Sequence, residues 1–488
     1  MVDVIVVGGG NAAFCAALSA QEQGKKVLML ERAPEEESGG NSRFTAGLFR
    51  LAYTGPDDLK QLIPDLTADE IANTDFGTYT EAQFLDDIAR VTEFRCDPDL
   101  TERLVKNSFS TVRWMRERGV RFTAAWGRQA FRIGGKFKFW GGLTVEAVGG
   151  GPGLVESETQ IAKKAGVEIW YGARALRLIA DDDGVHGVVV RKNGKTTEVK
   201  ARAVVLAAGG FQANTEWRTR YLGPGWELAK VRGTRFNTGD GIRMALDIGA
   251  AAHGNWSGCH AVAWDRNAPE TGDLAVGDNF QKHSYPWGVY INADGKRFVD
   301  EGADFRNYTY AKYGRVILSQ PKQFAWQIFD AKVKAQLRDE YRIRQVTKIT
   351  GNTLEELVSK MDDTDQKAAL ETLRQYNAAV QTQIPFNPNV KDGRCTKNLS
   401  IDKSNWANTL DTAPFEAYAV TCGITFSFGG LRITPDAQVL SSDGEKIPGL
   451  YAAGELVGGI FWFNYPGGSG LTNGAVFGRI AGRSAASA

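Results

Sequence analysis

Hydrophobic runs and glycine-rich turns alternate at the start of the chain. Residues 3–7 (DVIVV) are followed by GGGNAA at 8–13, an alanine-rich stretch up to Gly24, and a second hydrophobic run at 26–30 (KVLML). Short hydrophobic runs bounded by turn residues are typical of buried strands, and the stretch between them is long enough for a helix. The pattern therefore predicts a strand, a helix ending at Gly24 and a second strand, which together make a parallel βαβ unit.

Helical and strand patterns continue further along the chain. Hydrophobic residues recur at helical spacing over 81–118, and another helix is expected near 153–166. Alternating residues predict strands at 167–171, 174–180, 185–192 and 197–200, joined by Asp-Gly and Asn-Gly turns. The hydrophobic run that starts at Ala203 ends in Gly209 and Gly210, so it predicts another buried parallel strand.

The composition changes at about residue 250 and changes back after residue 405. Between these points tryptophans, tyrosines and expected charged helices (329–341, 353–361, 364–381) replace the glycine-rich turns. We therefore predict a fold of the α/β class in which a Rossmann-like nucleotide-binding domain, formed by 1–250 and 406–488, is interrupted by an α+β capping domain at 251–405.

Length and charge narrow the class of protein. A chain of 488 residues is expected to form about two or three domains. Its formal net charge of +1 gives no reason to expect binding to nucleic acid or to a membrane surface. No hydrophobic run reaches the roughly 18 residues of a membrane span. No basic segment followed by a hydrophobic stretch precedes the first strand, so no signal peptide is expected and the cytoplasm is the predicted location.

The cysteines exclude several kinds of site. The five cysteines are scattered, and none forms a C-x-x-C pair. This spacing argues against a disulfide framework, a structural zinc site and an iron–sulfur cluster. No metal site is therefore predicted.

The first turn has the spacing of a dinucleotide-binding fingerprint. Gly8 permits the tight turn, Gly10 lets the backbone approach a pyrophosphate, and Ala13 lets the helix pack close to the sheet. Glu31 stands 23 positions after Gly8, where an acid accepts a hydrogen bond from a ribose hydroxyl. Because only one complete fingerprint is present, a second, nicotinamide dinucleotide is not expected.

Several segments in a fixed order resemble a known family. They are 8–31, 38–42, 204–211, 238–241, 295–301 and 449–455. This set resembles the fumarate reductase/succinate dehydrogenase flavoprotein family, which also contains the ketosteroid dehydrogenases. The resemblance covers nearly the whole chain and implies an FAD-binding domain interrupted by a capping domain, with the substrate between them.

Three further segments, 127–131, 136–142 and 464–471, resemble the CobZ-like tricarballylate dehydrogenase branch of this family. That resemblance implies an FAD-dependent oxidoreductase acting on a CH–CH bond. The reaction would convert tricarballylate to cis-aconitate by proton abstraction and hydride transfer to flavin N5. It also implies a small carboxylate substrate and a membrane-bound electron-transfer partner.

The resemblance implies that FAD is bound non-covalently, because Asn41 stands where members with covalent flavin carry a histidine. The C-terminal glycine-rich segment at 467–478 opens a predicted helix, whose positive N-terminus suits a reduced flavin. The residues expected to hold FAD are Gly8, Gly10, Asn11, Ala12, Glu31, Arg32, Gly40, Asn41, Ser42, Thr45, Ala46, Gly47, Ala175, Ala208, Gly209, Asp240, Gly454, Glu455, Ser469, Gly470 and Leu471.

Dehydrogenation beside a carboxylate needs a base, a hydride acceptor and cations that hold the substrate. Of the two histidines that fumarate reductases use, one falls at His260 and the other at Phe426. Of the two arginines, one falls at Tyr465 and the acid/base arginine falls at Phe305, next to Arg306. These departures put plain fumarate or succinate chemistry in doubt and favour a different acid.

The remaining polar residues still supply candidates for catalysis. We predict Arg306 for proton transfer, with Tyr308 and Tyr465 as alternatives and His260 as a further site residue. Positively charged residues at 43, 128, 132, 136 and 138 are available to hold a polycarboxylate, because arginine binds carboxylates with paired hydrogen bonds.

Two other functions stay open at this stage. Aromatic residues at Phe426 and Tyr465 favour a ketosteroid-type desaturase of a hydrophobic ketone. A flavin-dependent monooxygenase or a non-catalytic flavin-binding subunit is a further alternative. A cavity with three or more cationic side chains would favour an acid, whereas an aromatic cavity would favour a ring ketone. The oligomeric state, the electron acceptor and the exact substrate do not follow from the sequence.

Overall fold

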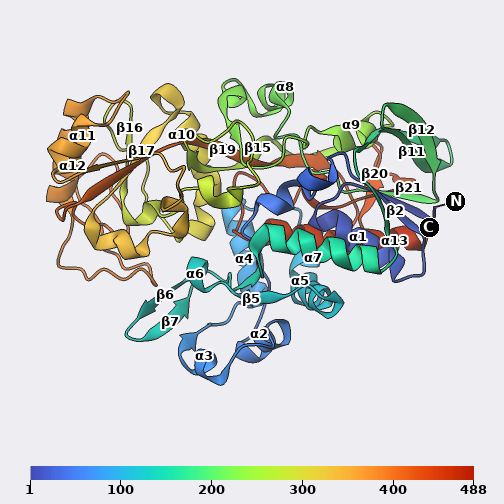
Figure 1. Ribbon diagram of the computed structural model, residues 1–488, viewed down its shortest axis with the longest axis horizontal. Coiled ribbons are helices and arrows are strands. Elements are labelled where there is room, and N and C mark those ends of the chain that lie inside the picture. The colour runs from blue at the N-terminus through green and yellow to red at the C-terminus, as the bar shows by residue number, and fades with distance from the viewer. Residues whose placement is uncertain (1) are drawn as a thin grey trace.

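The computed structural model describes residues 2–488, which form two lobes along the long axis of the molecule (Figure 1). One lobe holds both termini and the elements near them, including β1, β2, α1 and α13. The other lobe contains α11, α12, β16 and β17. Strands β15 and β19 run between the two lobes. The α/β fold class that the sequence predicts is confirmed.

The first lobe is built on a six-stranded sheet in the order β20-β21-β13-β1-β2-β9. Its strands are β1 (Val4–Val7), β2 (Val27–Leu30), β9 (Glu168–Trp170), β13 (Ala203–Leu206), β20 (Gln438–Leu440) and β21 (Lys446–Ala452). All neighbours are parallel except β20 and β21. The predicted strands at 3–7, 26–30 and 203 onward are therefore confirmed, and their carboxyl ends lie at one edge.

Helices α1 (Asn11–Gln21) and α13 (Ser469–Ala486) pack closely beside this sheet. Glycines recur every four residues along α13, at Gly474, Gly478 and Gly482, so they share one face of the helix. A Cβ at Gly478 would lie 2.4 Å from the Ala12 carbonyl oxygen, and one at Gly482 would lie 2.1 Å from the Ala16 carbonyl oxygen. Only glycine therefore permits this approach.

The segments between β2 and β13 form smaller elements. The helices are α2 (Pro56–Leu62), α3 (Ala68–Ala72), α4 (Glu81–Val91), α5 (Pro98–Arg118), α6 (Trp126–Gln129) and α7 (Gly150–Lys164). The strands are β3 (Leu48–Phe49), β4 (Thr74–Asp75), β5 (Phe122–Ala124), β6 (Ala130–Ile133), β7 (Lys136–Phe139), β8 (Val145–Ala147), β10 (Ala173–Asp181), β11 (Gly184–Lys192) and β12 (Lys195–Lys200). The expected strands of 174–200 and the helices of 81–118 and 153–166 are confirmed.

The second lobe is built on a sheet centred on β19 (Phe415–Leu431), which pairs with β14, β15, β17 and β18. The other strands are β14 (Lys230–Val231), β15 (Ala252–Asp265), β16 (Val289–Asn292), β17 (Ala325–Phe329) and β18 (Lys348–Gly351). The helices in this part of the sequence are α8 (Thr215–Trp217), α9 (Asp240–Leu246), α10 (Tyr310–Leu318), α11 (Leu354–Ser359) and α12 (Gln366–Ala379). The sheet thus takes strands from both sides of the predicted 251–405 segment, whose domain boundaries stay a prediction.

The helix predicted over 329–341 is wrong. Phe329 ends β17, and two short 3₁₀ helices follow at Ala331–Gln336 and Asp339–Tyr341. The backbone N–H of Arg338, an extended residue between them, donates to Ser284 Oγ at 3.3 Å rather than to a helical carbonyl. Buried side chains at helical spacing misled the sequence pattern, because this non-helical segment also buries them.

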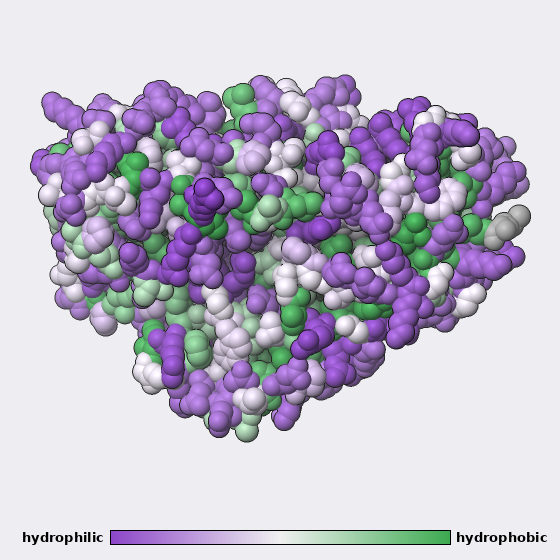
Figure 2. All heavy atoms as spheres, in the orientation of Figure 1, coloured by the Kyte–Doolittle hydropathy of each residue, from purple (hydrophilic) through white to green (hydrophobic). Residues whose placement is uncertain are grey.

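Most side chains on the face in Figure 2 are hydrophilic, with hydrophobic residues in scattered groups. Within residues 2–488, no helix combines the length and the hydropathy that crossing a membrane requires. Nor do three or more His, Cys, Asp or Glu side chains gather as a metal site in that range.

Candidate active site

One large cavity extends from the carboxyl edge of the first sheet to the second lobe. Its empty volume is about 1920 Å³, a figure that includes open solvent. The predicted cofactor residues that line it are Gly8, Gly10, Asn11, Ala12, Glu31, Arg32, Gly40, Asn41, Ser42, Thr45, Ala46, Ala175, Ala208, Gly209, Asp240, Gly454, Glu455, Gly470 and Leu471. Gly47 and Ser469 do not line it. Residues from distant parts of the chain therefore converge on one elongated site.

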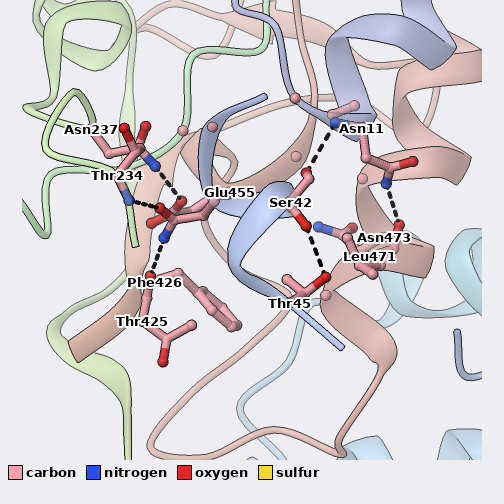
Figure 3. A pocket seen from close by; sticks show the side chains of 18 of the residues that line it. Asn11, Ser42, Thr45, Thr234, Asn237, Thr425, Phe426, Glu455, Leu471 and Asn473 are labelled. Atoms are coloured by element: carbon pink, nitrogen blue, oxygen red, sulfur yellow. Dashed lines mark hydrogen bonds between the residues drawn. The ribbon is translucent and has the colours of Figure 1, made fainter. Parts of the chain in front are cut away.

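The N-terminus of α1 opens into this cavity. Gly8 has a φ of +126°, and a Cβ there would lie 2.2 Å from the Ala207 carbonyl oxygen, so the turn requires glycine. No side chain caps the helix at Gly10, and the Asn11 N–H donates to Ser42 Oγ at 3.0 Å (Figure 3). The uncapped end leaves backbone N–H groups and the positive end of the helix dipole available to a phosphate.

Glu31 lies at the end of β2 as a buried acid. Its Oε1 accepts a hydrogen bond from the Ala33 N–H at 2.6 Å, and the residue lines the cavity. Burial raises the pKa of Glu31 to about 7. A carboxylate in this position suits a ribose hydroxyl.

Arg32 and Asp240 interact directly. Asp240 accepts one hydrogen bond from Arg32 at 3.1 Å and two from Arg174 at 2.9 and 3.1 Å. These contacts join the end of β2 to α9 and β10. Two guanidinium groups share one carboxylate, so the three side chains together carry a net positive charge at this end of the cavity.

Glu455 and Asn41 bring together loops from both lobes. Glu455 accepts hydrogen bonds from the Ser427 N–H at 3.0 Å and from the Asn237 amide at 3.4 Å (Figure 3), and burial raises its pKa to about 7. Asn41 donates to the Thr425 carbonyl at 2.6 Å and accepts from the Thr234 N–H at 2.9 Å. Through these hydrogen bonds, both side chains hold the surrounding loops in place at the middle of the cavity.

A second helix N-terminus faces the same cavity. Helix α13 begins after Gly468, whose φ is +83°, and Gly467, Gly468, Gly470 and Leu471 line the cavity. The positive end of a long helix stabilises negative charge on a neighbouring ring. Together with the α1 N-terminus and Glu31, this arrangement fits a flavin dinucleotide.

Arginines without ion pairs gather at the other end of the cavity. Arg128 has no side-chain hydrogen bond and Arg306 donates only to the Arg128 carbonyl oxygen, among the residues that the structure describes. Burial lowers the pKa of Arg306; the charge of the buried Glu340 opposes this shift, and Arg128 adds to it. Burial, followed by the charge of Arg306, lowers the pKa of the adjacent Arg338 to about 9. Like charges held this close favour an anionic ligand.

Sequence reasoning missed Arg232, which also lines this end. Its guanidinium is buried and donates to Asp278 at 2.8 Å, to Thr425 Oγ1 at 3.1 Å and to Gln281 at 3.3 Å. Asp278 and Gln281 come from a distant segment, so no spacing in the sequence could reveal the cluster. The neighbouring Gly233 is the only local signal.

Aromatic side chains form the wall beside the arginines. The hydroxyl groups of Tyr310 and Tyr465 lie 2.5 Å apart. The fully buried His260 ring packs behind them, stacked on Phe426 at 5.1 Å between centroids, and neither of its ring nitrogens has a hydrogen-bond partner within residues 2–488. Burial lowers the pKa of His260 well below its ordinary value, so it is neutral. Tyr465 thus reaches the cavity and His260 supports it from behind.

Tyr308 is not brought to the cavity. Its hydroxyl donates to Asp87 at 2.7 Å and lies 3.0 Å from the Gly141 carbonyl oxygen, in a separate small cleft. A tight 3₁₀ turn at Arg306–Tyr308 directs neighbouring side chains to different sides. The predicted catalytic residues Arg306 and Tyr465 therefore meet in one cavity, whereas Tyr308 lies outside it.

A dinucleotide-binding edge joined to a cation-lined cavity defines the chain as a flavoprotein oxidoreductase. Comparison with known proteins gives the family. A family model described as FAD binding domain matches residues 3–471. The chain belongs to this FAD-binding family, and FAD is its cofactor.

Individual relatives narrow the class of reaction. The fumarate reductase (cytochrome) of Shewanella frigidimarina is 29% identical over 490 residues, which cover 99% of this chain and 77% of the relative. The open conformation of a flavocytochrome c3 fumarate reductase matches with a TM-score of 0.73 at 27% identity, covering 100% of this chain and 78% of that one. These likenesses place the chain among FAD-dependent oxidoreductases that act on CH–CH bonds.

The fold extends to enzymes of more distant sequence. The 3-ketosteroid Δ1-dehydrogenase of Sterolibacterium denitrificans matches with a TM-score of 0.76, 100% coverage of this chain and 99% of that one, at 20% identity. At this identity the likeness shows a common fold and leaves the substrate to be argued from the cavity.

Proposed function

We propose that the protein is a dehydrogenase that introduces a C=C bond next to a carboxylate, with conversion of tricarballylate to cis-aconitate as its reaction. The observation that carries this proposal is the pair of arginines, Arg128 and Arg306, that face the cavity without an ion pair. Arg232, ion-paired with Asp278, and His283, whose pKa burial lowers well below its ordinary value, line the same end without adding free charge. Arginine binds carboxylates through paired, charge-assisted hydrogen bonds, so this end suits a polycarboxylate.

A hydrophobic ketone fits this cavity less well. The aromatic wall of Tyr310, Phe426 and Tyr465 would accept a ring, but the opposite side carries Arg128 and Arg306. Covering unpaired guanidinium groups with an apolar ligand leaves buried charge without compensation and is strongly unfavourable. The cationic side therefore favours an acid over a ketosteroid.

The reaction removes a proton from one substrate carbon and a hydride from its neighbour. The electron pair that the proton leaves behind forms the C=C bond, and the hydride takes its own electron pair with it. FAD, when bound, supplies the two-electron acceptor for this chemistry. Arg128 holds a substrate carboxylate away from the reacting carbons, and Arg232, which is ion-paired with Asp278, lines the cavity beside the aromatic wall. The aromatic wall keeps water from the reacting carbons.

Arg306 is the residue that we propose for proton transfer. Burial lowers its pKa, against the opposing charge of Glu340, and this favours release and uptake of a proton. Burial raises the pKa of Tyr465, which disfavours the tyrosinate that a base would need. Tyr465 instead holds its hydroxyl against Tyr310, so its proposed role is to orient the substrate.

We further propose that FAD is held non-covalently and that electrons leave to a membrane-bound partner. Support for the first point comes from Asn41, which is not a nucleophile and whose amide is engaged by two backbone groups. The second point is supported by the resemblance to the tricarballylate dehydrogenase branch, and the sequence has one complete dinucleotide fingerprint.

A turnover assay tests the proposal. Purified protein with FAD, tricarballylate and an artificial electron acceptor should form cis-aconitate. Arg306→Ala should lower turnover by roughly two orders of magnitude while FAD stays bound, because general acid–base catalysis contributes about 10²–10⁴-fold. Near-normal turnover in this variant would remove Arg306 from proton transfer, and absence of cis-aconitate in the wild type would contradict the proposed reaction.

A further inference from the structure

A short segment of the nucleotide-binding lobe reaches the second lobe beside the cavity. It consists of residues 126–140, which form α6, β6 and β7, and is called the arm below. Side chains from the second lobe bind its backbone carbonyls: Arg338 donates to Gly127, Arg306 to Arg128, and Asn389 to Phe131 at 3.1 Å. The arm is therefore fixed through its main chain, which leaves its side chains free for other contacts.

Aromatic stacking fixes the arm further. Trp140 stacks on Phe305 with 5.1 Å between ring centroids, and Phe131 meets Trp287 edge-on at 5.5 Å. Such aromatic pairs contribute beyond the area that they bury. These contacts hold the middle and the end of the arm in one position relative to the second lobe.

Two side chains of the arm enter the cavity without partners. Arg128 has no side-chain hydrogen bond or ion pair within residues 2–488. The Gln129 side chain is buried, at 3% exposure, and its Oε1 has no hydrogen-bond partner in the same range. Buried polar groups are normally satisfied, and rotating the Gln129 amide by 180° exchanges Oε1 for Nε2, which can donate to a ligand carboxylate beside the unpaired cation.

We propose that Arg128, assisted by Gln129, binds the carboxylate that is not attached to either reacting carbon, and thereby selects tricarboxylates over dicarboxylates. This inference rests on the function proposed above. Arg306 and Arg232 lie on the second lobe beside the aromatic wall, where the reacting carbons are proposed to lie. Arg128 comes from the other lobe, on an element that no proposed chemical step uses.

The product and one analogue isolate this carboxylate. cis-Aconitate is maleate that carries a carboxymethyl group on one alkene carbon, and citraconate carries a methyl group there instead. Neither donates electrons to oxidised flavin, so binding can be measured without turnover. The difference between their affinities therefore reports the extra carboxylate.

Calorimetric titration of the oxidised, FAD-loaded protein with both ligands tests the inference. Arg128→Met should weaken the binding of cis-aconitate by about 10- to 100-fold, as expected for a lost charged hydrogen bond. It should change the affinity for citraconate by less than about 3-fold. Gln129→Leu should weaken cis-aconitate by about 2- to 10-fold, as a neutral hydrogen bond would. Arg132→Met, in the same arm but exposed, should change neither.

The outcomes separate this inference from the proposed function. If Arg128→Met loses the same affinity for both ligands, or loses no affinity for cis-aconitate, the proposed role of Arg128 is overturned and the proposed function is not. A wild-type protein that binds neither ligand would overturn the proposed function and the inference with it. If Arg128→Met fails to retain FAD, Arg128→Lys replaces it, and this variant should give an intermediate loss confined to cis-aconitate.

Discussion

At the scale of the residue, Glu31 combines cofactor recognition with sensitivity to pH. One of its oxygens is held by the Ala33 N–H, and the residue lines the cavity. Because burial raises its pKa to about 7, the carboxyl group changes charge near neutral pH. A ribose hydroxyl donates better to the ionised form, so bound FAD favours the carboxylate.

Glu31→Gln should therefore weaken FAD binding by roughly 10- to 100-fold at pH 8, where the wild-type carboxylate is ionised. In the wild type the affinity for FAD should rise as the pH increases through about 7 and level off above it, whereas the variant should show no such rise. Fluorescence titration of the FAD-free protein measures both effects. Glu36→Gln, an exposed residue nearby, is the control, and an equal pH dependence in Glu31→Gln would contradict the assignment.

The sequence predicted residues well where their signal is local. Glu31 follows from a fingerprint contained within one βαβ unit. Arg232 does not, because its partner Asp278 belongs to a separate loop and only folding brings them together. Tyr308 was expected beside Arg306, but one tight turn separates them, and side-chain direction in such a turn does not follow from spacing.

At the scale of the element, the arm formed by α6, β6 and β7 links the two lobes. Its contacts with the second lobe are three side-chain donors and a set of aromatic rings. Arg338 donates to the carbonyl of Gly127 and lies over the Phe131 ring at 4.2 Å. Removing this guanidinium should loosen the arm at its start.

Arg338→Met should increase hydrogen exchange in residues 126–139 by roughly 5- to 150-fold, since one hydrogen bond to a charged group and a cation–π contact together stabilise by about 1–3 kcal/mol. Mass spectrometry of the exchanged peptides measures this. Lys334→Met, exposed on the same segment, should leave exchange unchanged. Exchange confined to the Arg338 segment, with the arm unaffected, would contradict the role of this contact.

Element prediction succeeded where hydrophobic periodicity and local capping agree. Helix α4 begins at a capping box formed by Thr80 and Gln83, and its buried residues recur at helical spacing. The segment 329–341 has a comparable spacing of buried residues but no continuous helix, because the Arg338 N–H bonds to Ser284 of another segment. Tertiary hydrogen bonds of this kind are not encoded in local periodicity.

At the scale of the whole molecule, the cavity joins the two lobes and contains buried acids that interact with several loops. Glu455 binds Ser427 and Asn237, so its ionisation affects segments from both parts of the chain. Burial raises its pKa from an ordinary 4.5 to about 7. The folded protein therefore binds this proton more tightly than the unfolded chain does, and the stabilisation is present at low pH and lost as the pH rises through about 7.

The difference in unfolding free energy between Glu455→Gln and the wild type should accordingly shift in favour of the variant as the pH rises from 5 to 8, by about 3 kcal/mol at most. The buried histidines titrate alike in both FAD-free proteins and cancel in the difference. Urea unfolding at several pH values measures it, with the exposed Glu445→Gln as control. If this difference in unfolding free energy does not vary with pH, the pKa of Glu455 is not raised in the folded protein.

The central claim is that a polycarboxylate reduces the bound flavin. Anaerobic addition of tricarballylate to the FAD-loaded protein tests it directly through the visible absorbance of the oxidised flavin. We predict that the absorbance is lost and that cis-aconitate forms in equal amount, while a hydrophobic ring ketone has no effect. Unchanged absorbance with tricarballylate, or bleaching by the ketone alone, would contradict the account.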